Sequence, residues 1–411
     1  MKTEWKKVRL GEIATFSNGI NFGKESYSAG VKLISVSDFG DRYFPDYDSL
    51  VEIDEKVLRE SDYLKDGDIV FVRSNGNKEL VGRCMMIKNP QYPVTYSGFC
   101  IRARLNDLEK FDTKFFLYNF KSRKFRQSIA NLSKGTNIQN LNQQILSNYE
   151  IDLPPLSTQQ KIAGVLSAYD DLIENNRRQI KLLEEAAQKL YKEWFVKLNF
   201  PGHENTKIVD GVPDGWTCKS ILSCDFFKQT NPSVQEFDGI KKYYATADVN
   251  GTNIDSDGEN ITYNNRPSRA SVQPCINSVW FARMSNSYKI LTCFGASEEL
   301  AETSIISSGF AGFTCDEKYY GFIHTLISSD FFDGEKNRYA TGATQVSLTN
   351  EGLRRINILL PTEDLIIKFS NQVNNFIKEC ELLKIQNQDL QLARDKLLPK
   401  LMRQPHERRV K

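Results

Sequence analysis

The chain contains one segment twice, and this internal repeat limits the folds that it can adopt. Residues 134–155 read KGTNIQNLNQQILSNYEIDLPP, and residues 341–362 read TGATQVSLTNEGLRRINILLPT. The two segments align without a gap at an offset of 207 residues, and a repeat of this kind predicts two structural units built on one plan. The shared residues are Gly135/Gly342, Leu141/Leu348, Leu146/Leu353, Ile151/Ile358, Leu153/Leu360 and Pro154/Pro361.

The repeat continues upstream, with offsets that drift only between 207 and 211 residues. The upstream matches are DIVFVRSN (68–75) with SVWFARMSN (278–286), which pairs Phe71 with Phe281 and Arg73 with Arg283, YSGF (96–99) with SSGF (307–310), and Trp5 with Trp216. So small a drift over so long a stretch indicates that the chain is two copies of one plan.

Each copy ends in a segment whose apolar residues recur at alternating steps of four and three, which is the spacing of a coiled-coil seam. In the first copy, from Ser157 onward, the seam positions are Ile162, Leu166, Tyr169, Ile173, Asn176, Ile180, Leu183, Ala187, Leu190 and Trp194. At the offset of 207 the second copy gives Phe369, Val373, Phe376, Cys380, Leu383, Asn387, Leu390, Arg394, Leu397 and Leu401.

An apolar stripe on a helix must be covered by something. The stripe could pack on the domain that carries the helix, but two copies in the same register favour pairing of the two helices with each other. Asn176 in the first seam is matched by Asn387 in the second. A polar residue at such a position serves register rather than stability.

The rest of each copy alternates short apolar runs with Gly, Asn, Asp and Ser, a pattern typical of strands joined by turns. Helical stretches such as residues 114–132 interrupt these runs. The predicted fold class is α+β, with two repeated strand-rich domains joined by two long helices that pair as an antiparallel coiled coil. The expected boundaries are a first domain at 1–156, a first spacer helix at 157–205, a second domain at 206–362 and a second spacer helix at 363–411.

Composition restricts the class of protein. The 411 residues are 40% hydrophobic and 26% charged, without an apolar run long enough to span a membrane or an apolar leader, so we expect a cytoplasmic protein. The eight cysteines form no C-x-x-C pair, and the three histidines have no zinc-ligand spacing around them. We therefore expect neither a metal nor a cofactor.

At this point the pattern resembles a known family. Two strand-rich regions, each closed by a Leu-Pro-Pro or Leu-Pro-Thr step, and a long helix that opens with LSTQQKIAGVLSAYDDLIENN (156–176) are similar to the specificity subunit of type I restriction-modification enzymes. The resemblance implies that each domain is a target recognition domain for one half of a split DNA sequence, and that the helices set the separation. It also implies double-stranded DNA, two methyltransferase (modification) subunits and, in the full complex, restriction subunits as partners.

Candidate base-reading residues lie in polar loops at equivalent places in the two copies, because Arg can bind guanine and Asn or Gln can bind adenine in the major groove. Ordinary solvated turns would have a similar composition, so the recurrence of the loops is what favours a role in binding. In the first domain they are Arg73, Ser74, Asn75, Asn77, Lys78, Lys134, Thr136, Asn137 and Gln139, and in the second Arg283, Ser285, Asn286, Lys289, Thr344 and Gln345.

Net charge does not by itself indicate DNA binding. Residues 1–156 hold 23 basic and 20 acidic side chains, whereas residues 206–362 hold 14 basic and 18 acidic ones. Affinity for phosphate must then come from a local patch or from partner subunits.

Two other classes stay open. NPQY (89–92) is similar to the loop with which amino-methyltransferases bind a flipped adenine, but no glycine-rich cofactor loop precedes it, and Pro90 and Pro93 suit a turn. A self-contained methyltransferase or nuclease is therefore disfavoured, and we expect no catalytic residues. The remaining alternative is a scaffold whose duplicated domains bind protein.

The predicted helices also carry apolar residues away from the seam, and surplus apolar surface on a rod favours a docking subunit. These residues are Val165, Leu172, Leu182, Tyr191, Phe195, Leu382, Ile385, Leu392 and Leu398.

Overall fold

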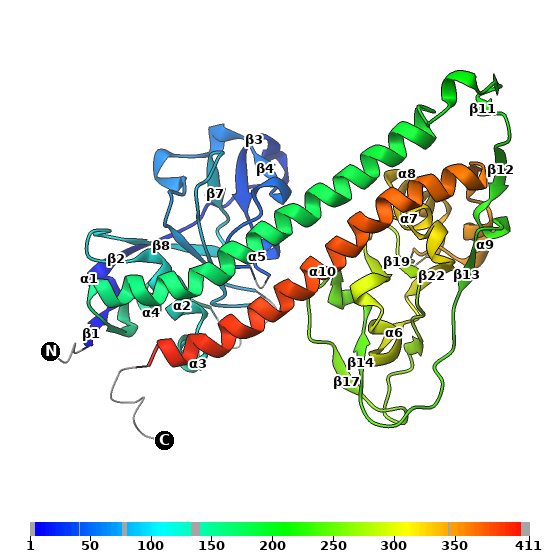
Figure 1. The fold of residues 1–411 in the computed structure, drawn as a ribbon. Coiled ribbons are helices and arrows are strands. Elements are labelled where there is room, and N and C mark those ends of the chain that lie inside the picture. Colours follow the sequence, from blue (N-terminus) through cyan, green and yellow to red (C-terminus); the bar gives the residue numbers. More distant parts are fainter. Residues whose placement is uncertain (1–4, 41, 76–79, 133–139, 344–345, 404–411) are drawn as a thin grey trace. The chain divides into compact units, whose positions relative to one another are not determined.

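The computed structural model describes residues 5–40, 42–75, 80–132, 140–343 and 346–403. The chain forms two compact units, one made of Met1–Ile173 with Leu390–Lys411 and the other of Glu174–Asp389. Helices α5 (Leu156–Tyr191) and α10 (Glu363–Leu401) each contribute residues to both units. Each unit therefore holds one strand-rich region together with part of both long helices (Figure 1).

The first unit contains a sheet with the strand order β2-β8-β5-β6 and a smaller one with the order β4-β3-β7, in which β3 and β7 run parallel. Strand β1 (Lys6–Arg9) pairs antiparallel with β9 (Glu150–Leu153), so the two ends of the region are joined. The other bounds are α1 Leu10–Ile13, β2 Ala14–Asn18, β3 Tyr27–Ile34, β4 Glu52–Ile53, β5 Ile69–Val72, β6 Cys84–Met86, β7 Val94–Tyr96, β8 Cys100–Leu105, α2 Thr113–Lys121, α3 Arg123–Leu132 and α4 Gln143–Asn148.

The second unit repeats this topology and adds a fourth strand, β18, to the counterpart of the sheet β4-β3-β7. Its sheets have the orders β13-β22-β19-β20 and β17-β14-β21-β18, β14 runs parallel to β21, and β12 (Thr217–Ser220) pairs antiparallel with β23 (Asn357–Leu360). The other bounds are β10 Ile208–Val209, β11 Val212–Pro213, β13 Phe227–Thr230, β14 Lys241–Tyr244, β15 Val249–Asn250, β16 Asn253–Ile254, β17 Glu259–Ile261, β18 Ala270–Val272, β19 Ser278–Ala282, β20 Ile290–Cys293, α6 Leu300–Thr303, β21 Ser304–Ser307, β22 Phe310–Cys315, α7 Glu317–Ile327, α8 Asp330–Tyr339 and α9 Asn350–Arg354.

Equivalent residues begin equivalent helices in the two copies. The side chain of Asn142 accepts a hydrogen bond from the Ile145 N–H at the start of α4, and Thr349, 207 residues later, accepts one from the Gly352 N–H at the start of α9. Such caps satisfy the unpaired N–H groups of a first helical turn. The repeat therefore preserves local folding signals as well as core residues.

One sequence match is corrected by the strand register. Cys100 pairs with Val72, and Phe310 pairs with Ala282, so Phe310 is the counterpart of Cys100. The match of YSGF with SSGF instead aligned Phe99 with Phe310. The offset here is 210, and Gly309 occupies the place of Phe99. The alignment of these two similar segments therefore matched Phe310, a buried strand residue, with Phe99, an exposed turn residue.

Each unit has an aromatic core that the long helices help to cover. In the first, Phe71 of β5 packs among Phe120 and Phe125, and Leu166 of α5 and Leu398 of α10 belong to the same cluster. In the second, the largest cluster joins residues of both long helices to the sheet β13-β22-β19-β20. The helices are thus part of the core of each unit.

The pairing of α5 with α10 is antiparallel, and its central polar contact differs from the sequence interpretation. The Asn176 amide donates to Oδ1 of Asn387 over 3.1 Å, and both side chains are buried. At the repeat offset of 207, however, Asn176 corresponds to Leu383, and Asn387 corresponds to Ile180. The asparagines are therefore partners across the seam rather than equivalents. The other seam residues are buried or half-buried, including Ile162, Leu166, Tyr169, Ile173, Ile180, Leu183, Leu190, Phe369, Val373, Phe376, Leu383, Leu390 and Leu397.

Three of the residues expected on a docking surface lie inside the cores instead. Tyr191 and Phe195 belong to the core cluster of the second unit, and Leu398 belongs to that of the first. Helix α5 changes to a π-helical turn over Lys192–Val196, which places Trp194 and Phe195 against the domain. The residues that stay exposed are Val165, Leu172, Leu182, Leu382 and Leu392.

Candidate nucleic-acid interface

In the first unit, two segments that the sequence singled out meet at the end of β5. Ser74 forms an antiparallel bridge with Asn140, and the Leu141 N–H donates to the Arg73 carbonyl over 2.9 Å. Residues 73–75 and the chain around 140 therefore form one surface. The predicted residues Asn77, Lys78, Lys134, Thr136, Asn137 and Gln139 lie outside the described residues.

The second unit builds the same arrangement after β19. The Leu348 N–H donates to the Arg283 carbonyl over 2.8 Å, and Met284 forms an antiparallel bridge with Ser347. The Ser285 N–H also donates to the Val346 carbonyl over 3.0 Å. Thus the loop pairing occurs at the equivalent place in both copies, while Thr344 and Gln345 lie outside the described residues.

The two arginines of these loops have internal partners. Nη1 of Arg73 donates to the Gly98 carbonyl over 3.3 Å. The guanidinium of Arg283 donates to the Leu348 carbonyl over 3.0 Å and to the Asn350 side chain over 3.1 Å, and burial lowers its pKa. Arg283 therefore holds its loop against the start of α9. Its predicted contact with a base would compete with these bonds.

Side chains of α8 form hydrogen bonds with the backbone of the loop that follows β19. Asn337 accepts the Asn286 N–H over 2.8 Å, and the buried Lys336 ammonium donates to the Ser287 carbonyl over 2.7 Å. Asn286 itself is exposed and has a φ of +54°, a conformation that asparagine tolerates. Lys289 donates to the Thr246 carbonyl over 2.6 Å. The loop is held from several sides with Asn286 at its surface.

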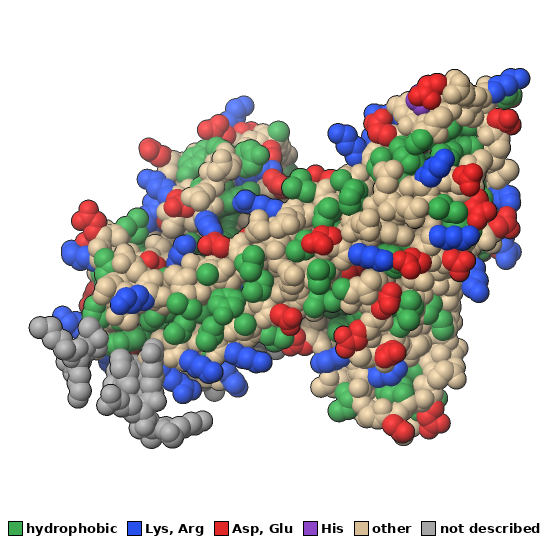
Figure 2. Space-filling model, viewed as in Figure 1, with side chains coloured by type: hydrophobic (Ala, Val, Ile, Leu, Met, Phe, Trp, Pro, Cys, Tyr) green, Lys and Arg blue, Asp and Glu red, His purple; other side chains and the backbone are tan. Residues whose placement is uncertain are grey.

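The sequence interpretation missed a basic surface in the first unit. Arg123 and Lys124 are exposed at the start of α3, and Lys396, Lys400 and Arg403 are exposed near the end of α10. Figure 2 shows Lys and Arg side chains gathered around the part of the surface formed by α3 and the end of α10. Helix α8, the counterpart of α3, has acidic residues in its first turn. A local excess of cations on α3 suits phosphate contact.

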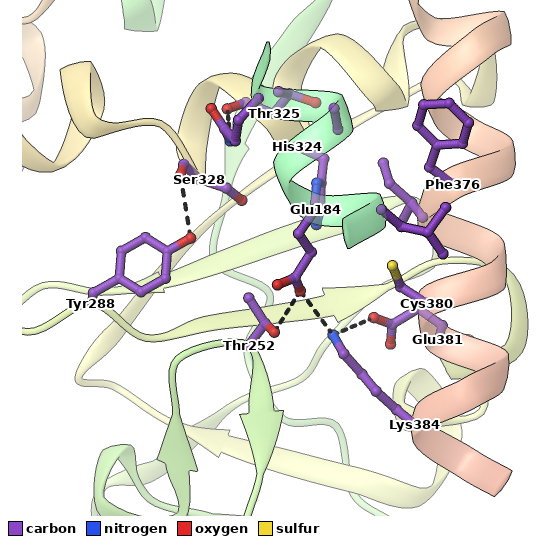
Figure 3. Close-up of a pocket in the computed structure, with 14 residues that line it drawn as sticks. Glu184, Thr252, Tyr288, His324, Thr325, Ser328, Phe376, Cys380, Glu381 and Lys384 are labelled. Atoms are coloured by element: carbon purple, nitrogen blue, oxygen red, sulfur yellow. Dashed lines mark hydrogen bonds and ion pairs between the residues drawn. The ribbon is translucent and has the colours of Figure 1, made fainter. Parts of the chain in front are cut away.

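A small pocket lies behind the second loop, between α5, α10 and the turn that joins β15 to β16 (Figure 3). The Lys384 ammonium lies 2.8 Å from Oε1 of Glu381 and 3.9 Å from Oε1 of Glu184. The Thr252 hydroxyl donates to Glu184 over 2.7 Å, and the Tyr288 hydroxyl donates to the Ser328 carbonyl over 3.2 Å. These paired groups fasten the turn and the loop to the domain.

His324 lines the same pocket without a charge at neutral pH. Burial, with a contribution from the positive charge of Lys384, lowers its pKa to about 3. Its Nε2 lies 3.3 Å from the Thr292 hydroxyl oxygen. A histidine with so low a pKa is a weak proton acceptor, so this arrangement suits support of the loop better than acid-base chemistry. Among the residues that the structure describes, no cluster of His, Cys, Asp and Glu could hold a metal ion.

The NPQY segment lies in the connection between β6 and β7. The Asn89 N–H donates to Asp66 over 2.6 Å, and Asn89 has a φ of +44°. Tyr92 is half exposed. The segment therefore has the geometry of a connecting turn.

In the described parts of the chain, no helix is long and apolar enough to cross a bilayer.

Comparisons with known proteins agree with this architecture. Residues 2–185 match the type I restriction modification DNA specificity domain. The type I restriction enzyme MjaIX specificity subunit of Methanocaldococcus jannaschii is 26% identical over 97% of this chain and 92% of its own length. The HindI specificity subunit of Haemophilus influenzae is 21% identical over 97% and 99% of the two chains.

A solved structure shows the same fold. The crystal structure of the S subunit of a type I restriction-modification system from M. genitalium aligns over 97% of this chain and 96% of its own, with a TM-score of 0.53 and 16% identity. The resemblance drawn from the sequence is confirmed. The chain is similar to type I restriction-modification specificity subunits over nearly its whole length, and residues 2–185 match the DNA specificity domain of such enzymes.

Proposed function

We propose that this chain is the non-catalytic specificity subunit of a type I restriction-modification complex and that it reads a bipartite DNA sequence in the cytoplasm. The observation that carries the proposal is the recurrence of one loop pairing, Ser74 with Asn140 and Met284 with Ser347, in two domains of the same topology. Two similar readers on one helical support suit a target with two half-sites, as in dimeric DNA-binding proteins.

The long helices supply the support. Helix α5 has 36 residues, which corresponds to about 54 Å at about 1.5 Å per residue. The sequence boundaries 1–156, 157–205, 206–362 and 363–411 then separate two readers from two spacer segments. In this proposal the paired helices set the distance between half-sites, because a coiled coil resists bending more than a single helix does.

The exposed apolar residues of the helices are the proposed docking surface for modification subunits. Leu182 is 64% exposed and Leu392 is 54% exposed, although both lie on helices whose other faces are buried. Leu182 belongs to the second unit and Leu392 to the first. We propose two methyltransferase subunits per chain, one for each unit, with restriction subunits joining the complete assembly.

The proposal is tested by sequencing the methylated sites of cells that express the complex. The wild-type protein should direct methylation to one bipartite sequence. Arg73→Ala should relax the preference in one half, and Asn286→Gly, which keeps the positive φ, should relax it in the other, each by about 1–3 kcal/mol for a bidentate contact. Arg283→Ala is the less specific variant, because it also removes the anchor of the loop.

Loss of preference in the same half-site for both variants would contradict the assignment of one reader to each half. If the purified chain showed no salt-dependent binding to DNA, the alternative of a protein-binding scaffold would replace the proposal.

The spacer function has its own test. Seven residues inserted between Gln179 and Lys181, with a matching insertion near Asn387, keep the heptad face and add about 10 Å of helix. The expected methylated sequence has the same two halves and a spacer longer by about three base pairs, at about 3.4 Å of rise. Affinity should fall, because one half-site also rotates around the duplex. An unchanged spacer would show that the helices do not set the distance.

A further inference from the structure

Phe99 of the first unit is an exposed aromatic residue that does not contribute to the core of its domain. Phe99 is 61% exposed, whereas Cys100 after it is fully buried and begins β8. Isolated exposed aromatic residues occur on many surfaces, so exposure alone does not indicate a function. What distinguishes Phe99 is how its backbone is held and which side chains surround it.

The turn that carries Phe99 is fixed by three segments of the chain. The Cys100 N–H closes the turn by donating to the Ser97 carbonyl over 2.8 Å. The Arg73 N–H donates to the Phe99 carbonyl over 2.7 Å, and the Gly98 N–H donates to the Ile20 carbonyl over 2.6 Å. A side chain on such a turn is presented to solvent in a defined place, which lowers the entropic cost of a contact made there.

The turn that carries Phe99 is bordered by residues whose side chains can bind base edges. The Arg73 guanidinium donates to the carbonyl of Gly98, immediately before the ring-bearing residue, and the Ser74 N–H points to the Phe99 carbonyl at 3.4 Å. On the other side, a Cβ added at Gly98 would meet Oδ1 of Asn21 at 2.2 Å, so the Asn21 amide lies against the turn. The turn that carries Phe99 is therefore bordered by an arginine, a serine and an asparagine.

The second unit shows that the turn folds without an aromatic ring. Gly309 occupies the equivalent place, and its carbonyl accepts the Arg283 N–H over 2.9 Å, the same bond that Phe99 makes with Arg73. The phenylalanine is thus not required by the backbone geometry that the two copies share. A feature present in one reader and absent from the other is expected of a residue that distinguishes two half-sites.

We propose that Phe99 contacts the 5-methyl group of a thymine in the half-site that the first domain reads. That methyl is the apolar group that base edges present in the major groove, and aromatic side chains are among its known partners. The same groove admits the contact expected of Arg73, and an asparagine such as Asn21 can bind adenine there. This inference rests on the proposed function, since it assigns a base to one of the two readers.

The test uses the full chain in complex with its modification subunits and a target taken from the methylated sites. Each thymine of the first half-site is replaced in turn by uracil, which pairs identically but lacks the methyl, and Kd is measured by fluorescence anisotropy. At one position uracil should weaken wild-type binding about four-fold, the factor expected for burial of one methyl-sized group. Phe99→Ala should weaken binding to the thymine duplex by a similar factor and should show no further loss with uracil.

Two variants control for structural effects. Phe99→Leu keeps an apolar side chain and should retain part of the discrimination. Tyr92→Ala removes another exposed aromatic ring of the same unit, 50% exposed, and should behave as the wild type at every thymine. The melting temperature of each variant should stay close to that of the wild type, because these side chains are at least half exposed.

The outcomes separate this inference from the function on which it rests. A wild-type complex that binds all sequences equally overturns the proposed function and the inference together. A sequence-specific wild type overturns the inference alone if its half-site lacks thymine, or if uracil has the same effect on the wild type and on Phe99→Ala at every position.

Discussion

The two units share a topology, yet they attach the long helices by different chemistry. In the first unit, Arg394 of α10 lies 2.5 Å from Asp170 of α5, with both side chains buried, and its guanidinium stacks 4.0 Å from the ring centre of Tyr43. At the offset of 207, Ile377 takes the place of Asp170 and Ala187 takes that of Arg394. Both counterparts are buried apolar residues of the second core.

A buried ion pair and a buried apolar pair occupy equivalent places between the long helices, but they respond differently when one partner is lost. Burial raises the pKa of the Asp170 carboxyl, while the charge of Arg394 and the hydrogen bond from the Tyr118 hydroxyl act in the opposite direction. The pair therefore depends on both partners being present, because a lone buried charge is costly. An apolar pair depends on shape alone. The two units thus share a topology, but the residues that form equivalent contacts in them differ in chemical type.

The largest expected effect comes from breaking the ion pair. Arg394→Ala should destabilise the first unit by about 3–5 kcal/mol, since it leaves the Asp170 carboxylate buried without its cationic partner, with only the Tyr118 hydroxyl bonded to it. Hydrogen exchange of α2 measures this loss, and exchange of α7 in the second unit should stay unchanged.

A variant of the first unit that carries the equivalent residues of the second unit tests whether the two contacts are interchangeable. Tyr118 and Phe322 each lie six residues after the N-cap aspartate of their helix, Asp112 or Asp316. The triple variant Arg394→Ala, Asp170→Ile and Tyr118→Phe therefore copies Ala187, Ile377 and Phe322. It should recover most of the stability that Arg394→Ala loses. If it is as unstable as the single variant, the two contacts are not interchangeable.

The next effect concerns the asparagine pair of the seam. Asn176→Leu leaves the buried Asn387 amide without its partner and should cost about 1–3 kcal/mol in the free energy of unfolding. Asn176→Leu with Asn387→Ile copies Leu383 and Ile180, the apolar counterparts, and should be as stable as the wild type or more so. Denaturant unfolding measures both.

The role in register makes a separate prediction for the same double variant. Without a polar pair, helices can shift or associate between chains, so light scattering should detect oligomers that the wild type lacks. A double variant that stays monomeric and fully active would assign the asparagines no part in register.

A smaller difference between the units should appear on acidification. The folded pKa of His324, about 3, lies below the unfolded value, so the unfolded state binds more protons between these two values. The stability that the neutral histidine contributes is complete above about pH 6.5 and should fall toward pH 3, by at most about 1.4 kcal/mol per pH unit.

Exchange rates of α7 and α2 at pH 7 and pH 5 provide the measurement. Helix α2 contains no histidine, so only α7 should lose protection by this route, and His324→Gln should remove the difference. Equal acid sensitivity in wild type and variant would place the titrating group elsewhere.

The smallest effect on stability belongs to the docking surface. Leu182→Asp and Leu392→Asp change exposed side chains and should alter the free energy of unfolding by no more than about 0.5 kcal/mol. Each should nevertheless remove one modification subunit, and the double variant should remove both, as measured by the mass of the purified complex. Full occupancy in the double variant would locate the docking surface elsewhere.

The sequence by itself determined the duplicated plan, the fold class and the heptad seams, because these depend on periodicities that local backbone geometry imposes. A strand has a period of two and a helix one of 3.6, so apolar spacing reveals which face is covered. It also located the loops at Arg73 and Arg283, since polar residues follow buried strands at both places.

Only the tertiary structure decided which residue covers which. Periodicity does not contain the direction in which two helices pair, and antiparallel packing made partners of Asn176 and Asn387, which are not equivalent by the repeat. In the same way, Tyr191, Phe195 and Leu398 lie off the seam but are buried, because each domain covers a second face of the helices. Strand register, a long-range property, replaced the match of Phe99 with Phe310 by Gly309. Contacts between distant segments depend on the complete packing of the chain, and no local pattern records them.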